Sequence, residues 1–302
     1  MDLPRQAEML ANRVRKTHRQ LHGRFEQQGI GAFRLYDRDI PEIRVVIDWY
    51  EGHLVMAEYT RTQTLAVEDW LGTMARAVAA ALEVPMERVH LKQRRTRPAE
   101  GPRYERLAQT GGRIEVRERG LRFLCNLDDY IDTGLFPDHR ETRARVRAES
   151  KGARVLNLFG YTGSFTCAAA AGGAAATTTV DLSQNYLRWA QDNLELNQLY
   201  GPQHQLIRAD ARAFLEEESE RRYSLIVCDP PTFSDGFDVG RDHRALIEQC
   251  LALLEPGGVL WFSTNHQRFE PNLPAAAVEM TDKTVPPDYR NRTVHRSFRI
   301  AK

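Results

Sequence analysis

Five glycine or polar residues recur at intervals along the second half of this 302-residue chain, each directly after a short apolar run. They are Gly160, Asp181, Asp210, Asp229 and Asn265. Because the apolar runs alternate with helical segments, we predict parallel strands whose carboxyl ends lie at one edge of a doubly wound α/β sheet. One aspartate alone could simply cap the next helix. Several in register predict a binding crevice at that edge.

The first of these positions belongs to a strand, turn and helix unit. The run 155–159 is apolar, 160–163 is a glycine turn, and 164–171 is predicted to be helical. Glycine lets the backbone approach a ligand, and the helix N-terminus presents N–H groups to an anion. The spacing is not that of a dinucleotide fingerprint. With Asp181 placed to accept ribose hydroxyls and Asp210 beside an adenine, the combination favours S-adenosylmethionine.

The motif Asp229-Pro-Pro-Thr-Phe233 is the most specific in the chain. Its two prolines fix a rigid turn after a predicted strand. Such a turn projects the Pro230 carbonyl and the Phe233 ring over the crevice. A flat heteroaromatic substrate needs this arrangement, since stacking on an aromatic ring contributes about 1–3 kcal/mol. The alternative is a purely structural turn with a core phenylalanine.

Composition restricts the classes of protein that fit. The net charge is +1, so no global field indicates a partner. The four cysteines, Cys125, Cys167, Cys228 and Cys250, lack metal or redox spacing and are predicted to be small core residues. The N-terminus has no signal-peptide pattern, and no apolar run is long enough to span a bilayer. We therefore expect a cytoplasmic protein without a membrane or metal partner.

Three regions are expected along the chain. Residues 1–92 should form an α+β accessory domain that binds RNA, 93–126 a basic β-hairpin linker, and 127–302 the catalytic α/β domain. The helices expected from periodicity are 7–28, 67–82, 141–149, 164–171, 183–196 and 241–254. The strands expected are 32–36, 45–50, 53–59, 89–91, 155–159, 176–181, 205–209, 223–228 and 259–263, with 278–284 and 297–300 as a final edge hairpin.

Basic residues outnumber acidic ones between 88 and 122, although the net charge of the whole chain is only +1. The runs 114–117 and 121–124 alternate as hairpin strands do. We predict that this hairpin contacts RNA phosphates, and the alternative is a solvated linker. The arginines expected to bind RNA are Arg94, Arg95, Arg97 and Arg103.

Four motifs carry a family resemblance. They are Asn157-Leu-Phe-Gly-Tyr-Thr-Gly163, Thr177-Thr-Thr-Val-Asp-Leu-Ser183, Asp229-Pro-Pro-Thr-Phe-Ser234 and Phe262-Ser-Thr-Asn265. With them, the chain resembles class I S-adenosylmethionine-dependent RNA methyltransferases. It is more narrowly similar to the C-terminal K module of the bifunctional large-subunit rRNA guanine methyltransferase family RlmKL.

The narrower resemblance extends over nearly the whole chain. It includes Ala11-Asn-Arg-Val-Arg-Lys16, Phe33-Arg-Leu-Tyr-Asp37, Tyr130-Ile-Asp-Thr-Gly-Leu-Phe136, Asp138-His-Arg140 and Asn291-Arg292. Two departures stand out. The N-terminal half of that family, with its RNA-binding module and N2-guanine methyltransferase, is absent from this sequence. The segment after Ser234 is also shorter than the basic loop usual in the family.

The resemblance implies a Rossmann-like class I sheet, S-adenosylmethionine as cofactor, and a set of site residues. In such enzymes the loop 132–140 folds over the cofactor. The implied cofactor contacts are Phe136, Arg140, Asn157, Phe159, Tyr161, Thr162, Gly163, Asp181, Leu182, Asp210, Ala211 and Asp229. The catalytic residues expected are Asp229 and Pro230, which hold the guanine edge, and Phe233, which stacks on the base.

The activity implied is methyl transfer to guanine N7 in 23S rRNA or a large-subunit precursor. That nitrogen has an available lone pair, so no proton-abstracting residue is assigned. Methylation of guanine N2 or adenine N6 is the stronger alternative. Methylation of cytosine C5 needs a cysteine nucleophile, and the expected places hold Thr232 and Thr264. A non-catalytic RNA-binding or assembly protein is the alternative of another class.

Overall fold

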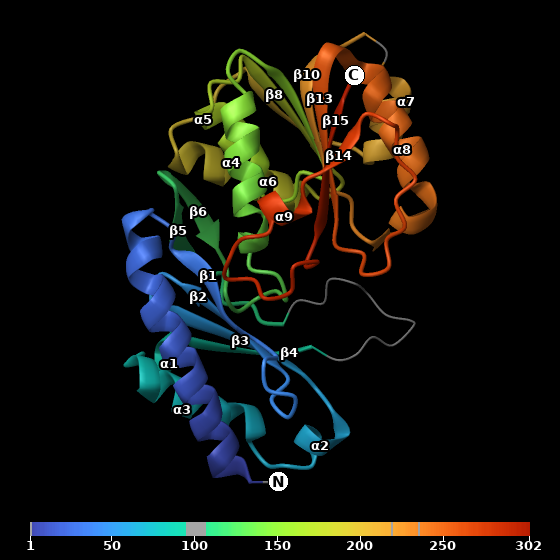
Figure 1. The fold of residues 1–302 in the computed structure, drawn as a ribbon. Helices are drawn as coiled ribbons and strands as arrows, with labels where there is room; N and C mark the ends of the chain where they lie inside the picture. The colour runs from blue at the N-terminus through green and yellow to red at the C-terminus, as the bar shows by residue number, and fades with distance from the viewer. Residues whose placement is uncertain (1, 95–106, 219, 235) are drawn as a thin grey trace. The chain divides into compact units, whose positions relative to one another are not determined.

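The computed structural model describes residues 2–94, 107–218, 220–234 and 236–302, which fold into two compact units (Figure 1). The first comprises Met1–Pro137 with Asp288–Arg290, and the second comprises Asp138–Pro287 with Asn291–Lys302. Among the described residues, no helix combines the length and the apolar character needed to cross a bilayer.

The first unit is a four-stranded sheet covered by two long helices. Its strand order is β1-β2-β3-β4, antiparallel except for the parallel pair β3 and β4. Its core joins Val14 of α1 and Met74 of α3 to Ile47 and Leu54 of the sheet, all buried. The elements are α1 (Leu3–Gln27), β1 (Ala32–Asp37), β2 (Val45–Tyr50), β3 (His53–Tyr59), α2 (Thr62–Leu65), α3 (Trp70–Leu82), η1 (Met86–Arg88), β4 (Val89–Arg94), β5 (Ile114–Glu118) and β6 (Leu121–Cys125).

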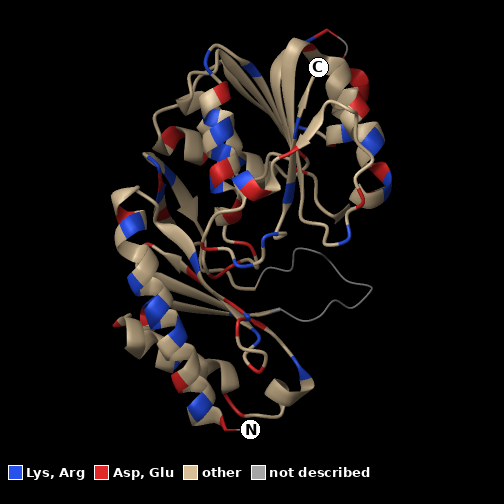
Figure 2. Cartoon of the chain, in the orientation of Figure 1, with Lys and Arg blue, Asp and Glu red and all other residues tan. Residues whose placement is uncertain are grey.

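Local chemistry sets the ends of α1. The Asp2 carboxylate accepts a hydrogen bond from the Arg5 amide at 3.1 Å, and a proline lies in the first turn. The helix ends before Gly29, whose φ of +63° an L-residue rarely adopts. One long side of α1 packs on the sheet, whereas basic residues such as Arg15 and Arg19 are exposed (Figure 2).

Gly23 in α1 and Gly172, which caps the C-terminus of α5, should respond in opposite ways to replacement by alanine. A Cβ at Gly23, an exposed position near the C-terminal end of α1, would meet nothing within 4 Å. Gly23→Ala should therefore raise the free energy of unfolding by about 0.5–1 kcal/mol. A Cβ at Gly172 would lie 2.1 Å from the Arg147 carbonyl oxygen, so Gly172→Ala should lower it. Urea unfolding of both variants checks this, and a change of the same sign in both would contradict it.

The structure divides the chain at a different place from the expected boundary at 126/127. Residues 126–137 belong to the first unit because its sheet holds them. The buried Lys92 ammonium, on a residue only 2% exposed, donates to the carbonyls of Tyr130 at 2.5 Å and Ile131 at 3.1 Å. The Tyr50 hydroxyl lies 3.0 Å from Thr133 Oγ1. The β5–β6 hairpin is likewise part of this unit rather than a separate linker.

The second unit is built on a seven-stranded sheet in the order β14-β15-β13-β10-β7-β8-β9. The five strands β13, β10, β7, β8 and β9 run parallel to one another, whereas β15 pairs antiparallel with both β13 and β14. The elements are η2 (Pro137–His139), α4 (Arg140–Glu149), β7 (Arg154–Leu158), α5 (Ser164–Ala171), β8 (Ala176–Asp181), α6 (Gln184–Leu196), β9 (His204–Arg208), α7 (Ala211–Glu217), β10 (Tyr223–Cys228), β11 (Phe233–Ser234), β12 (Phe237–Asp238), α8 (Val239–Leu253), β13 (Leu254–Thr264), β14 (Ala277–Glu279), α9 (Thr281–Thr284) and β15 (Arg296–Ala301).

Helices cover both faces of this sheet (Figure 1). On one face, Phe214 of α7 and Ile247 of α8 pack with strand residues such as Ile226. On the other, Val146 of α4 and Phe165 of α5 pack with neighbouring strand positions, because successive side chains of a strand point to opposite faces. The prediction of a doubly wound, Rossmann-like sheet is confirmed.

The predicted edge strand 278–284 is only partly correct. Residues 277–279 form β14, which pairs antiparallel with β15 as the expected final hairpin. Residues 281–284 instead form the helical turn α9. Thr284 Oγ1 bonds to the Met280 carbonyl at 3.0 Å and lies 2.6 Å from Ser297 Oγ, so buried polar contacts stabilise the turn where residue type favours a strand.

Candidate active site

The strand order reverses direction between β7 and β10. From β7 the chain builds β8 and β9 on one side, and then returns to place β10 on the other side. Leu158 at the end of β7 pairs with Cys228 at the end of β10. A crevice at the carboxyl ends of the strands opens at such a switch point. The glycine turn 160–163 and the motif 229–233 therefore begin close to one another at that edge.

The glycine turn and the residue before it contain strained backbone, which contacts with neighbouring elements hold in place. Phe159 and Tyr161 have φ of +55° and +48°, which side chains disfavour. Gly163 has φ of +73°, and a Cβ there would lie 2.7 Å from the Cβ of Ala190 on α6. The Thr162 carbonyl accepts a hydrogen bond of 2.9 Å from Nδ2 of the buried Asn193 side chain. Sequence reasoning missed Asn193, because it lies 31 positions away inside a helix.

Asp181 joins this turn to the next strand. Its Oδ2 accepts from the Tyr161 amide at 2.9 Å, and its Oδ1 accepts from the Ser183 amide at 2.8 Å. Burial raises the pKa of Asp181, and the two amide hydrogen bonds oppose that shift. The carboxylate thus fixes the turn and still has lone pairs to accept further hydrogen bonds.

Asp210 caps the helix that follows its strand. Its Oδ1 accepts from the amides of Arg212 at 2.9 Å and Ala213 at 3.1 Å, as an N-cap does. One oxygen of Asp210 therefore acts as a helix cap, which was the alternative given above for a single aspartate. Its contact with an adenine stays a prediction.

The Asp229 carboxylate lies at the head of the proline turn, with 27% of its side chain exposed. Its Oδ1 accepts a hydrogen bond of 2.6 Å from Ser263 Oγ at the end of β13. Beyond the prolines, Thr232 Oγ1 contacts Asn265 Oδ1, and the Phe233 ring meets the His266 ring edge-on at 5.9 Å. Residues at and just beyond the end of β13 thus contact Asp229, Thr232 and Phe233 of the motif that follows β10.

A cluster of Asp138, His139 and His295 lies next to Asp229. Their ligand atoms are within 4.8 Å of one another, as in many metal sites. However, the two imidazole rings stack at 4.1 Å with only 14° between their planes. Near-parallel rings cannot direct both lone pairs at one ion, which favours a hydrogen-bonded network over a metal centre. The expected absence of a metal stays a prediction.

A family model described as S-adenosylmethionine-dependent methyltransferase matches residues 32–288, which cover most of both units and contain the glycine turn, Asp181, Asp210 and the motif 229–233. The chain belongs to the S-adenosylmethionine-dependent methyltransferase family. The predicted cofactor, S-adenosylmethionine, is thereby confirmed.

Curated relatives of this methyltransferase are longer proteins. One from Allochromatium vinosum is 44% identical over 312 residues, covering 97% of this chain and 42% of the relative. One from Syntrophotalea carbinolica is 43% identical over 308 residues, covering 97% of this chain and 43% of the relative. Both are named ribosomal RNA large subunit methyltransferase K/L. The chain spans less than half the length of these relatives.

Solved structures share the fold of the methyltransferase. A candidate methyltransferase in complex with SAH aligns with a TM-score of 0.76 at 23% identity, covering 100% of this chain and 82% of that one. A second, from Streptococcus mutans, gives a TM-score of 0.74 at 23% identity, covering 98% and 81%. This likeness confirms the predicted fold class.

The remaining predicted contacts of the methyltransferase differ in their surroundings. Asn157 is buried, and its amide Nδ2 donates to Thr166 Oγ1 at 2.9 Å, so this group supports the first turn of α5. Leu182 is 66% exposed, whereas Ala211 and Arg140 are buried. Phe136 belongs to the first unit and is 38% exposed. Their contacts with the cofactor stay predictions.

The predicted RNA-binding arginines fall mostly outside the described residues. Arg95, Arg97 and Arg103 lie outside the described residues, and Arg94 is described only as the last residue of β4. In the hairpin that the structure does describe, Arg117 forms ion pairs with Glu26 at 3.0 Å and Glu51 at 2.8 Å. The positive charge of Arg117 is therefore balanced within the first unit.

The cysteines of the methyltransferase are buried, and Cys228, which directly precedes Asp229, has a raised pKa. All four cysteines are buried, and none forms a disulfide within the described residues. Burial, followed by the neighbouring Cys250, raises the pKa of Cys228 well above its usual value. A thiol with a raised pKa is a poor nucleophile, because only the thiolate attacks. This favours attack by a base nitrogen over cytosine C5 chemistry.

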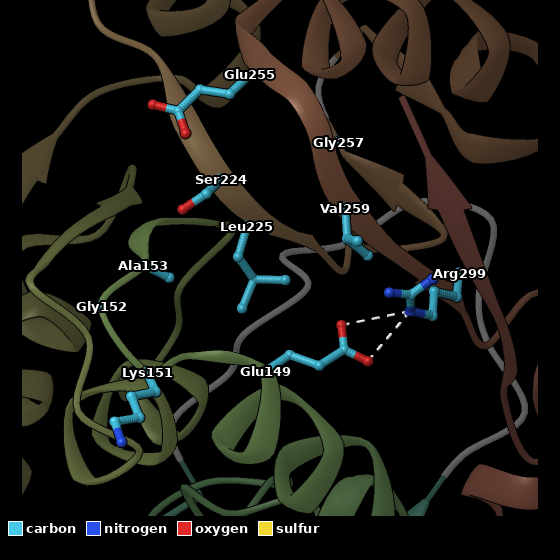
Figure 3. A pocket seen from close by; sticks show the side chains of 10 residues that line it. All are labelled: Glu149, Lys151, Gly152, Ala153, Ser224, Leu225, Glu255, Gly257, Val259 and Arg299. Carbon is cyan, nitrogen blue, oxygen red and sulfur yellow. Dashed lines mark hydrogen bonds and ion pairs between the residues drawn. The ribbon is translucent and has the colours of Figure 1, made fainter.

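A hollow of about 500 Å³ lies elsewhere on the second unit (Figure 3). Gly152, before β7, and Ser224, at the start of β10, line it, and Arg299 Nε donates to Glu149 Oε1 at 3.1 Å across it. The hollow therefore lies at the amino ends of the parallel strands. The predicted cofactor crevice lies at the opposite, carboxyl ends.

Proposed function

We propose that this methyltransferase transfers the methyl group of S-adenosylmethionine to guanine N7 in 23S rRNA, either mature or in a large-subunit precursor. The observation that carries the proposal is the Asp229-Pro-Pro-Thr-Phe233 turn beside the glycine turn at the switch point. The names of the relatives, which refer to large-subunit rRNA, support it.

In this proposal the two halves of the crevice have separate tasks. The N-terminal turn of α5, which follows the glycine turn, presents its N–H groups to the amino-acid carboxylate of the cofactor, Asp181 accepts the ribose hydroxyls and Asp210 lies beside the adenine. On the β10 side, Asp229 and the Pro230 carbonyl accept hydrogen bonds from the guanine edge while Phe233 stacks on the base. Extruding a base from a helix costs a few kcal/mol, which stacking offsets in part.

The chemistry then depends on orientation. Guanine N7 attacks the sulfonium methyl carbon with its own lone pair, the bond from carbon to sulfur breaks, and neutral SAH leaves. No proton has to be removed before attack. Alignment of nitrogen, carbon and sulfur can supply up to about 7–11 kcal/mol of the barrier. The arginines at 94, 95, 97 and 103 would hold the RNA through its phosphates.

An RNA without the proposed acceptor atom tests this assignment. We expect the enzyme to transfer labelled methyl groups to an unmodified transcript of large-subunit rRNA, and incorporation to fall to background on a transcript made with 7-deazaguanosine. The reason is that the substitution replaces N7 by a carbon atom without a lone pair. Equal binding of both transcripts is the control. Equal methylation of both would favour the alternatives, guanine N2 or adenine N6.

The remaining alternative is a non-catalytic RNA-binding protein that has kept the fold. The intact arrangement of Asp181 with the glycine turn argues against it, because a protein without a cofactor would not need the strained backbone at Phe159 and Tyr161. Isothermal titration with SAH separates the two readings, since the non-catalytic protein should not bind it.

A further inference from the structure

His139 is enclosed by three segments of the second unit. It immediately precedes α4, it is 5% exposed, and its ring stacks on His295 at 4.1 Å. The edge of the Phe165 ring on α5 lies against it at 5.8 Å. The ring therefore has little freedom to rotate, and the direction of its nitrogen atoms is fixed by packing.

One nitrogen of this ring faces two carboxylates. His139 Nε2 lies 3.6 Å from Asp229 Oδ2 and 3.8 Å from Asp138 Oδ2. Its Nδ1 is buried and, within the described part of the chain, has no hydrogen-bond partner. A buried N–H without an acceptor is costly, so we assign the proton of the neutral ring to Nε2, between the two oxygens.

The second carboxylate is already held. His295 Nδ1 lies 3.0 Å from Asp138 Oδ2, and Thr284 Oγ1 lies 3.3 Å from His295 Nε2. Asp138, His295 and Thr284 thus form a fixed support under His139. The Asp229 carboxylate is more exposed than that of Asp138, and the hydrogen bond that it accepts from a described residue, Ser263, fixes its Oδ1. Its Oδ2 is the atom whose position His139 can set.

We propose that His139 is a positioning residue, whose Nε2–H holds the Asp229 carboxylate in the rotamer that presents its open lone pairs to the substrate base. Ser263 fixes one oxygen and His139 directs the other. The contact of 3.6 Å is longer than a hydrogen bond, and such contacts tighten when a site is occupied. The inference rests on the proposed function, in which Asp229 contacts the base.

This role depends on a neutral ring. The charged or titratable groups that face His139 are Asp138, Asp229, His295 and Arg143. Burial, followed by His295, lowers the pKa of His139 below its usual value of 6.5. On acidification, an imidazolium between two carboxylates would draw Asp229 Oδ2 away from the base. Protonation of His139 should therefore lower the methylation rate at acidic pH.

The decisive comparison is His139→Ala with His139→Gln. Glutamine keeps a donor near the position of Nε2 but cannot titrate. We expect His139→Ala to lower kcat about tenfold or more, with SAH affinity nearly unchanged, and His139→Gln to recover most of that loss. As the pH is lowered from neutral, His139→Gln should also lack the part of the acidic decline that comes from protonation of His139 in the parent enzyme. Rates with labelled cofactor and unmodified rRNA transcript measure both effects.

Folding is followed in parallel by thermal unfolding. The unfolded chain takes up a proton at His139 near pH 6.5, whereas the folded chain does so only at lower pH. The stability of the parent enzyme should therefore fall as the pH drops below that value, and fall less in His139→Gln. Should His139→Ala fail to fold, the pH profile of His139→Gln decides on its own.

The outcomes separate this inference from the function that it refines. A parent enzyme that binds SAH but methylates no rRNA would overturn the proposed function. If the parent is active and Asp229→Ala is not, a His139→Ala variant with parental kcat would overturn only the positioning role. An acidic decline that persists unchanged in His139→Gln would overturn it too.

Discussion

Replacing Asp229 with alanine is expected to lower kcat/KM for rRNA methylation by roughly 10²-fold or more, because a base that is no longer held in line loses the benefit of orientation. The Ser263 hydroxyl, 2.6 Å from Asp229 Oδ1, would lose its acceptor, and the guanine edge would lose the carboxylate. Initial rates with labelled S-adenosylmethionine and an unmodified transcript measure the effect.

Two further variants show whether the loss comes from the carboxylate. Asp229→Asn keeps one acceptor for Ser263 and should fall between the parent and alanine. Glu216→Gln removes an exposed negative charge on α7 and should have no effect. SAH affinity in Asp229→Ala should fall by less than about tenfold, well below the loss in rate. Parental rates in Asp229→Ala would contradict the assignment of this residue to the base.

Replacing Asp181 with alanine is expected to weaken SAH binding by about 10²-fold, which corresponds to ~3 kcal/mol. Two causes combine. The amides of Tyr161 and Ser183 would lose their acceptors at 2.9 and 2.8 Å, so the strained turn would relax. The ribose hydroxyls would also lose the carboxylate that we propose accepts them. Isothermal titration measures the dissociation constant directly.

Asparagine at the same position distinguishes the two causes. Asp181→Asn keeps one acceptor oxygen but presents an NH₂ group to one of the two amides, so it should weaken binding less than alanine does. Thermal unfolding of both variants reports the loss of the turn itself. An Asp181→Ala protein that still bound SAH as tightly as the parent would remove Asp181 from the cofactor site.

Most of the second unit could be predicted from the sequence because its signals are local. Apolar runs of strand length alternate with amphipathic segments, and the glycine turn follows the central strand directly. The segment 281–284 could not be predicted, since its helical turn depends on contacts of Thr284 with Ser297, far along the chain. For the same reason the sequence did not indicate that Asp288–Arg290 belong with the first unit, where Asp288 Oδ2 accepts from the Arg34 amide.

The candidate site divides in the same way. Asp181 and Asp229 follow strands, so their type and place indicate their position at the carboxyl edge. Ser263 lay within a quoted motif, but its contact with Asp229 joins residues from different strands. Only folding brings His295 to the segment that holds Asp138 and His139, because Asp138 and His295 are 157 positions apart. No periodicity or local motif records such a pairing.

The most direct test of the central claim is to identify the methylated nucleoside. Unmodified large-subunit rRNA is incubated with the protein and isotopically labelled S-adenosylmethionine, digested to nucleosides, and analysed by chromatography with mass spectrometry. We expect the label in N7-methylguanosine, absent from the reaction of Asp229→Ala. Label in N2-methylguanosine, N6-methyladenosine or 5-methylcytidine, with none in N7-methylguanosine, would contradict the account.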